Sequence, residues 1–190
     1  TLLSHHGLHN YLSWAADYYQ IRADQRIPVQ SSFAFDATIT SLYTPLIRGA
    51  SVLLLPEQDE IAQLGNWLQQ GPEYCLLKIT PAHLEIINQQ LAPAEFATAA
   101  RSLVLGGEAL MQQHIAPWIT HAPQTRLINE YGPTEAVVGC AVYDACGQTT
   151  LPQAIPAGQP IANTRIHILD QQHQLVPLGV PGELCIAGAG

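Results

Sequence analysis

The stretch YCLLKITPAHLEIINQQL, residues 74–91, decides the fold that we expect for this chain of 190 residues. Its first part, 74–79, is a continuous apolar run, which is typical of a strand that is buried on both faces. Thr80 and Pro81 then supply an N-cap hydroxyl and a proline at the first helical position, so a helix should begin here. Apolar side chains follow at helical spacing: Leu84, Ile87 and Leu91. The stretch therefore predicts a buried strand that leads directly into an amphipathic helix.

The same alternation of strand and helix extends in both directions, from residue 8 to about residue 145. Further helices are expected over 7–21 and 108–119, and further strands over 30–36, 51–55, 102–106, 125–129 and 136–143. Repeated strand–helix–strand units predict an α/β fold with a mainly parallel sheet and helices on both faces.

After residue 150 prolines become frequent, and two segments, 164–170 and 182–188, have the pattern of strands. Together these features predict the start of an antiparallel sheet or barrel. We therefore expect an α/β subdomain over 1–150 and a β-rich segment over 151–190, which begins the next subdomain.

The composition excludes several classes of function. Hydrophobic residues make up 47% of the chain and charged residues 12%, which is enough apolar material for a core. A net charge of -8 with seven Lys plus Arg excludes a basic nucleic-acid footprint. No run of eighteen apolar residues suggests a membrane span. Four cysteines without C-x-x-C spacing fit a reducing, cytoplasmic setting, and the histidines of SHHGLH, residues 4–9, match no zinc spacing.

Several polar groups should gather at one edge of the predicted sheet. In parallel sheets ligands bind beyond the carboxyl ends of the strands, and predicted strand ends place four segments there: Asp36, Lys78, Gly106–Gly107 and 129–134. The last of these segments is part of the stretch NEYGPTE, 129–135, which contains three side chains that could bind a ligand. A tyrosine ring can stack on a base, a threonine hydroxyl can donate to a phosphate, and a glutamate can hold Mg²⁺.

Four motifs together resemble the adenylation domains of nonribosomal peptide synthetases, which belong to the acyl-adenylate-forming superfamily. They are FAFDATIT (33–40), LVLGGEAL (103–110), NEYGPTE (129–135) and PLGVPGELCIAGAG (177–190), in the order that this family has. The YGPTE form and the aspartate of the first motif favour amino-acid adenylation over acyl-CoA ligases or luciferases. The resemblance covers essentially the whole chain and implies a fragment of the large N-terminal lobe.

The resemblance implies a nucleotide site for ATP. Tyr131 would stack on the adenine, with the loop of Gly107, Glu108 and Ala109 on the other face, and Asn129 would bind the adenine edge. Within the same motif, Gly132 and Thr134 would lie at the nucleotide, with the hydroxyl of Thr134 at the α-phosphate. Glu135 would help to hold Mg²⁺.

The resemblance also implies an amino-acid pocket in which Asp36 binds the α-ammonium group. The matching side-chain positions are Ala37, Thr40, Lys78, Val104, Gly106, Glu130, Val138 and Gly139. Only Lys78 and Glu130 are charged, and the alternative explanation is an ion pair on the surface that has no role in binding. However, Lys78 lies in an apolar run that we expect to be buried, where a charge needs a partner. A donor that faces an acceptor suits a carboxamide, so asparagine is the expected substrate, with aspartate second and glutamine third.

The implied reaction converts an amino acid and ATP into aminoacyl-AMP and pyrophosphate, and then loads a phosphopantetheine thiol on a carrier domain beside condensation domains. The family's phosphate loop, ribose-binding aspartate and catalytic lysine have no match in these residues. We therefore expect a fragment without a catalytic residue of its own and without activity alone. The alternative is a non-catalytic binding or scaffold module that keeps the fold.

Overall fold

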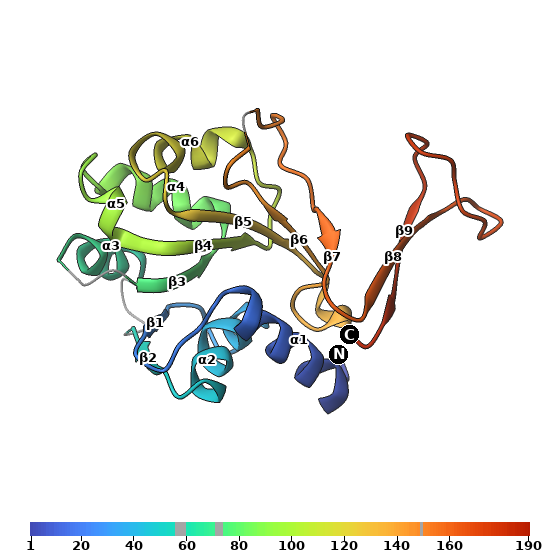
Figure 1. Ribbon diagram of the computed structural model, residues 1–190, viewed down its shortest axis with the longest axis horizontal. Helices are drawn as coiled ribbons and strands as arrows, with labels where there is room; N and C mark the ends of the chain where they lie inside the picture. Colours follow the sequence, from blue (N-terminus) through green and yellow to red (C-terminus); the bar gives the residue numbers. More distant parts are fainter. Residues whose placement is uncertain (56–59, 71–73, 149) are drawn as a thin grey trace.

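The computed structural model describes residues 1–55, 60–70, 74–148 and 150–190 (Figure 1). The helices are α1 (His5–Tyr18), α2 (Ala37–Ile47), α3 (Glu60–Gln70), α4 (Pro81–Gln90), α5 (Phe96–Ala99), α6 (Gln112–His121) and the 3-10 helix η1 (Thr134–Ala136). The strands are β1 (Arg26–Val29), β2 (Ser51–Leu54), β3 (Tyr74–Ile79), β4 (Ala100–Gly106), β5 (Arg126–Tyr131), β6 (Ala141–Asp144), β7 (Gln159–Pro160), β8 (Thr164–Leu169) and β9 (Glu183–Gly188).

The central sheet has the strand order β3-β4-β5-β6-β7. The first three strands are parallel, and β6 and β7 continue the sheet in antiparallel fashion. A separate parallel pair, β1-β2, lies at the end of the sheet where β3 is, and the antiparallel pair β8-β9 projects away from the main body (Figure 1). This arrangement confirms the predicted fold class, including the antiparallel strands that follow the α/β part.

Helices cover both faces of the central sheet and create two hydrophobic cores. One core lies beneath α3, α4, α5 and α6 and includes the fully buried Trp118 and Leu103. The other lies beneath α1 and includes Tyr11, Val104 and Ile128. All six residues of β3 are buried, as its apolar run predicted, because each face of the strand meets a different core.

The predicted helix start after β3 is confirmed. The side-chain hydroxyl of Thr80 accepts a hydrogen bond from the backbone N–H of His83, and Pro81 occupies the first helical position of α4.

One prediction at the α2 end of the molecule is wrong. Residues 30–36 form turns instead of a strand, because the strand is the preceding segment β1; Asp36 therefore occupies the N-cap position of α2 and does not end a strand. Residues 51–55 do contain strand β2, but it is not buried on both faces, and Leu54 is 59% exposed. β2 pairs only with β1 among the described residues, so one edge of this pair stays open.

The strand predicted over 136–143 begins only at Ala141. Val137 and Val138 have φ angles of 52° and 69°, in the left-handed region that a β-branched residue seldom adopts. They belong to a tight loop in which a Cβ at Gly132 would lie 2.5 Å from the carbonyl oxygen of Val138. The apolar run has a strand pattern, but the close packing of this loop against Gly132 overrides it.

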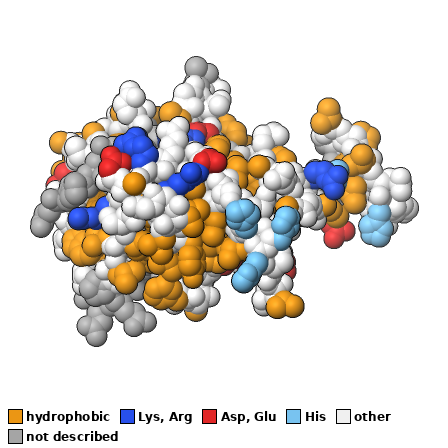
Figure 2. Space-filling model, turned by 60° about the horizontal axis from the view of Figure 1, so that its bottom comes forward, with side chains coloured by type: hydrophobic (Ala, Val, Ile, Leu, Met, Phe, Trp, Pro, Cys, Tyr) orange, Lys and Arg blue, Asp and Glu red, His pale blue; other side chains and the backbone are white. Residues whose placement is uncertain are grey.

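The face that carries α2 and β2 exposes a patch of apolar side chains (Figure 2). Its members are Phe33, Phe35, Tyr43, Leu46, Ile47 and Leu54. Among the residues that the structure describes, none forms a helix that is both long and apolar enough to cross a membrane.

The core beneath α4 gives a first test of the packing. Leu84 is fully buried and Ile86, two residues along the same helix, is 44% exposed. We expect Leu84→Ala to lower the free energy of unfolding by about 2–5 kcal/mol, because it removes buried methyl groups and leaves a cavity. Ile86→Ala should cost about 1 kcal/mol or less. Urea denaturation of both variants measures the difference, and equal losses would contradict the assignment of this helix face.

Candidate functional site

The face of the central sheet that lies beneath α1 carries most of the predicted pocket. Lys78 in β3 pairs in register with Val104 in β4, and Gly106 in β4 pairs with Glu130 in β5. Residues alternate between the two faces of a strand, and Val104 belongs to the core beneath α1. Lys78, Gly106 and Glu130 share its parity and its face, so the sheet brings together four positions that are far apart in the chain.

Lys78 and Glu130 form a buried ion pair. The Nζ atom of Lys78 donates to Oε1 of Glu130, and the two side chains are only 6% and 2% exposed. An unpaired charge at this depth would be strongly unfavourable, so each side chain requires the other. The expectation that Lys78 is buried and faces Glu130 is therefore met by the geometry, and a surface ion pair is excluded.

Three hydroxyl groups complete this cluster, and two of them were not identified from the sequence. Thr40 of α2, a predicted pocket residue, lies 2.6 Å from the hydroxyl of Tyr11 and accepts from Lys78 Nζ at 3.0 Å. Tyr11 donates to Glu130 Oε1 and Oε2 at 3.2 and 3.1 Å, and Tyr19 donates to Oε2. We call these five residues the polar cluster. Tyr11 lies in α1 and Tyr19 is its C-cap residue; both fall in the stretch 7–21, for which the sequence predicted only a helix.

Few hydrogen-bonding positions in the polar cluster remain unused. An ammonium group has three N–H donors, and those of Lys78 reach Glu130, Thr40 and, at 3.5 Å, the Tyr11 hydroxyl. A carboxylate offers about four acceptor sites, and three hydrogens point at that of Glu130: one from Lys78, one from Tyr19, and the single phenol proton of Tyr11, which is shared between Oε1 and Oε2. One N–H of Lys78 therefore makes only a long contact, and Glu130 receives three hydrogens for about four acceptor sites.

Asp36 and Ala37 lie at the start of α2, and both are half-buried. The carboxylate of Asp36 makes no capping hydrogen bond to the first turn of α2, but its charge affects the pKa of Tyr11 in the polar cluster. Burial raises the pKa of Tyr11 well above its ordinary value; the charge of Glu130 adds to this, and the charge of Asp36 adds a smaller part. Asp36 therefore lies near enough to Tyr11 for its charge to affect that phenol.

Two predicted pocket positions are occupied by glycine for a steric reason. A Cβ at Gly139 would lie 2.6 Å from Cδ of Glu130, and a Cβ at Gly106 would lie 2.7 Å from the carbonyl oxygen of Glu130. Neither position tolerates a side chain without moving Glu130. Val138, the remaining pocket position, is buried beside Gly139 in the strained loop.

The predicted adenine loop follows β4 at the carboxyl end of the sheet. Gly107 has a φ of +86°, a conformation that favours glycine. Glu108 accepts from the backbone N–H of Ala82 at 3.2 Å, so its side chain is tied to the first turn of α4. This bond anchors the loop that runs on through Ala109.

Asn129 and Tyr131 lie on the neighbouring strand β5. The amide nitrogen of Asn129 donates to the carbonyls of Ile155 and Pro156 at 3.2 and 2.8 Å. Within the described residues no hydrogen bond reaches its Oδ1 atom, which leaves an acceptor there. Tyr131 ends β5 and is 40% exposed, so its ring face is open to a ligand. Gly132 follows it and, as described above, has no room for a Cβ.

Thr134 and Glu135 are exposed in the short helix η1. No group of three or more His, Cys, Asp or Glu side chains able to hold a metal occurs in the described part of the chain. Mg²⁺ usually keeps several waters and binds through one or two carboxylates together with substrate phosphates. A single exposed carboxylate fits that mode, in which Mg²⁺ would arrive with the nucleotide.

Known proteins resemble this chain in sequence over its whole length. The family described as "AMP-binding enzyme" matches residues 1–190. Tyrocidine synthase 3 from Brevibacillus parabrevis is 34% identical over 190 residues, which cover 100% of this chain and 3% of that protein. Bacitracin synthase 3 from Bacillus licheniformis is 33% identical over 191 residues, again 100% of this chain and 3% of that protein. The chain therefore spans a small part of the relatives that it matches.

Solved structures share the fold. The AMPPNP-bound form of the nonribosomal peptide synthetase FmoA3 superposes with a TM-score of 0.86 at 23% identity, over 98% of this chain and 20% of that one. A holo four-domain nonribosomal peptide synthetase bound to AMP and glycine gives a TM-score of 0.82 at 29% identity, over 97% of this chain and 13% of that one.

The buried ion pair gives a second test. Lys78→Met leaves the charge of Glu130 buried without its partner, and we expect a loss of about 3–5 kcal/mol in the free energy of unfolding. Arg22 pairs with Asp24 at 3.3 Å on the surface, where both side chains are more than half exposed, so Arg22→Met should cost about 1 kcal/mol or less. Adding Glu130→Gln to Lys78→Met should recover part of the loss. Denaturant titration measures all three variants, and similar costs for Lys78 and Arg22 would contradict the burial argument.

The pH dependence of stability gives a third test. Burial, and then the charge of Glu130, raises the pKa of both Tyr11 and Tyr19 well above 10. In the unfolded chain tyrosine ionises near pH 10, so these phenols contribute stability that is fully present below pH 10 and is lost as the pH rises further. Each should contribute about 1.4 kcal/mol per pH unit to that loss.

The corresponding variant is Tyr11→Phe combined with Tyr19→Phe. Its unfolding free energy should fall less steeply above pH 10 than that of the wild type, whereas Tyr43→Phe, on the exposed face of α2, should keep the wild-type slope. Identical slopes for all three proteins would show that neither buried phenol is linked to folding.

Proposed function

The chain belongs to the family of AMP-binding enzymes, and from this we propose that it is the substrate-selecting part of an amino-acid adenylation domain of a nonribosomal peptide synthetase. The parent enzyme would activate an amino acid with ATP to form aminoacyl-AMP and pyrophosphate. The observation that supports the proposal most strongly is the polar cluster: a buried Lys78–Glu130 pair lies at the predicted amino-acid pocket.

Asparagine is the substrate that we propose for this pocket. A carboxamide offers a carbonyl acceptor and an N–H donor. The N–H of Lys78 that now reaches Tyr11 at 3.5 Å could turn to the carbonyl oxygen at little cost, because it is the longest of its three bonds. Glu130 would accept the amide N–H as a fourth hydrogen, at the position where it now shares the single proton of Tyr11. A carboxamide therefore matches the two positions that the cluster leaves available.

Charge balance disfavours aspartate, which remains the second choice ahead of glutamine. Asp36, Lys78 and Glu130 together carry one net negative charge. An amino acid with a neutral side chain adds none, since its ammonium and carboxylate cancel, whereas an aspartate side chain would add a negative charge and a second acceptor beside Glu130. Like charges at this depth are costly, so the pocket should reject it.

The nucleotide would bind along the carboxyl ends of β4 and β5. The exposed ring of Tyr131 supports stacking on adenine, and the Oδ1 atom of Asn129 is an acceptor for the exocyclic amine. The loop from Gly107 to Ala109 would cover the other face of the base, and the hydroxyl of Thr134 would reach the α-phosphate. Glu135 would supply one carboxylate ligand to Mg²⁺, whose chemistry is to neutralise charge on the phosphates.

The residues of this chain would bind and orient, and the catalytic group would come from elsewhere in the parent enzyme. In the proposed reaction the amino-acid carboxylate attacks the α-phosphate of ATP and pyrophosphate leaves. The aminoacyl group then passes to a phosphopantetheine thiol on a carrier domain, with condensation domains as further partners. Residues 1–150 would form the unit that holds both sites, and 151–190 would begin the next one. A reducing, cytoplasmic location is supported by four free cysteines.

Amino-acid-dependent ATP–pyrophosphate exchange by the intact enzyme tests this function. We expect the highest kcat/KM with asparagine, a value at least about tenfold lower with aspartate, and values on the order of 10⁴-fold lower with leucine or phenylalanine. Glu130→Gln should reduce the preference for asparagine over aspartate. Leading activity with an apolar amino acid would exclude the proposed pocket chemistry.

Two control proteins separate the alternatives. The isolated chain of 190 residues should show negligible exchange, since proximity of both substrates needs the complete cleft. A scaffold or binding module that only keeps the fold would bind AMP in the intact protein and show no exchange with any amino acid. Robust exchange by the isolated chain would overturn the assignment of catalysis to another part of the parent enzyme.

A further inference from the structure

We propose that Tyr11 of α1 and Tyr19, the C-cap residue of that helix, are positioning residues that fix Glu130 as a hydrogen-bond acceptor beside Lys78 and thereby set the pocket's preference for a carboxamide over a carboxylate. The inference rests on the proposed function and goes beyond it, because neither tyrosine belongs to the motif positions from which the pocket was derived. Both fall in the stretch 7–21, for which the sequence predicted a helix and no role in the site.

Tyr11 lies at the centre of the polar cluster. Its hydroxyl lies within hydrogen-bond distance of Thr40, of both oxygens of Glu130 and of Lys78 Nζ. Because Thr40 can donate its own proton to Tyr11, the phenol proton of Tyr11 is free to go to Glu130. Tyr11 thus has two roles. A substrate carbonyl would have to replace its hydroxyl as an acceptor from Lys78, and its proton holds Glu130 in the orientation that faces Lys78.

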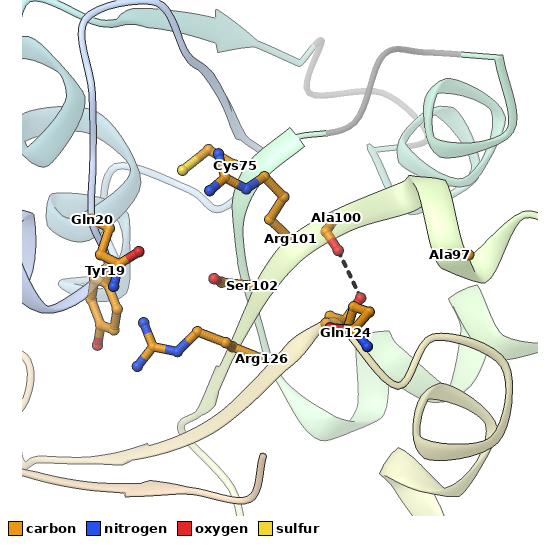
Figure 3. Close-up of a pocket in the computed structure, with 10 residues that line it drawn as sticks. Tyr19, Gln20, Cys75, Ala97, Ala100, Arg101, Ser102, Gln124 and Arg126 are labelled. Carbon is orange, nitrogen blue, oxygen red and sulfur yellow. Dashed lines mark hydrogen bonds between the residues drawn. The ribbon is translucent and has the colours of Figure 1, made fainter. Parts of the chain in front are cut away.

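Tyr19 holds the opposite oxygen of Glu130 and lies between the polar cluster and a separate cavity. Its side chain lines a cavity of about 250 Å³ at the amino ends of β3, β4 and β5, together with Cys75, Ser102 and Arg126 (Figure 3). The hydroxyl donates to Oε2 of Glu130, and Tyr19 is 1% exposed. Tyr19 therefore separates Glu130 from this cavity, whose cationic residue Arg126 is already paired with Asp144 at 2.8 Å.

The two phenols serve as permanent donors. Burial and the charge of Glu130 keep the pKa of each well above 10, so both stay protonated across the physiological range. A protonated phenol beside a carboxylate can only reinforce its role as an acceptor. With both Oε atoms held, Glu130 is fixed as an acceptor, which suits an N–H donor and repels a second carboxylate.

Tyrosine-to-phenylalanine substitutions in the intact enzyme test the inference, because they remove a hydroxyl and keep the ring. The ratio of kcat/KM for asparagine to kcat/KM for aspartate should fall about tenfold in Tyr19→Phe, which corresponds to one charge-assisted hydrogen bond. The change should appear mainly as a higher KM for asparagine, with kcat nearly kept. Tyr11→Phe should show a similar fall.

Tyr18→Phe is the matched control. Tyr18 lies on the same helix, stacks on Trp14 and contacts Arg126 through its ring, outside the polar cluster. Its selectivity ratio should stay within about twofold of the wild type. An unchanged ratio in Tyr11→Phe and Tyr19→Phe, alongside a selective wild-type enzyme, would overturn the inference while the proposed function stands.

A second measurement does not depend on turnover. Thermal unfolding of Tyr19→Phe, Glu130→Gln and the double variant should be non-additive, because each removes the same hydrogen bond. The loss of melting temperature from Tyr19→Phe should be several degrees in the wild-type background and clearly smaller once Glu130→Gln is present. The same cycle with Tyr18→Phe should be additive. If the wild type prefers an apolar amino acid, the proposed function fails; additivity in the Tyr19 cycle would overturn the positioning role whatever the substrate.

Discussion

The structure depends on the burial of one ion pair. Lys78 lies in β3 and Glu130 in β5, on either side of β4 in the parallel part of the sheet, and both side chains are buried. Neither could remain charged there without the other. This pair restricts the residues around it. The carboxylate needs a hydroxyl donor such as Tyr11 of α1, and positions 106 and 139 must be glycine because any side chain there would displace Glu130. An apolar core would have been simpler to stabilise, so this cost points to a role in recognition.

Much of the fold follows from local pattern. The apolar run of β3, the Thr80 cap and the helical spacing after it are local signals, and the structure matches them because the central strands are covered on both faces. The errors lie where local pattern and tertiary context disagree. The segment 30–36 has strand-like residues, but it ends in Asp36, the N-cap residue of α2, and forms turns. The segment 136–140 also has strand-like residues, but it forms a tight loop that packs against Gly132.

The site could be predicted in part. The motif positions that converge on the pocket were found because each is recognisable in its own short stretch. Tyr11 and Tyr19 could not be found in that way, since they lie 119 and 111 residues from Glu130 in the chain. A tyrosine on an apolar helical stripe usually indicates packing. The available signal was physical: a buried carboxylate needs several donors, and a search for partners on the covering helix would have suggested them.

The left-handed conformations of Val137 and Val138 bear on how this pocket can change during evolution or engineering. A β-branched residue held there stores backbone strain, commonly of order 1–3 kcal/mol. Replacement of Val138 by glycine or asparagine would release some of it while reshaping the pocket wall. The strain released at this position would offset part of the packing that the buried Val138 loses, whereas substitution of Thr40 or Val104, both wholly enclosed, has no such compensation.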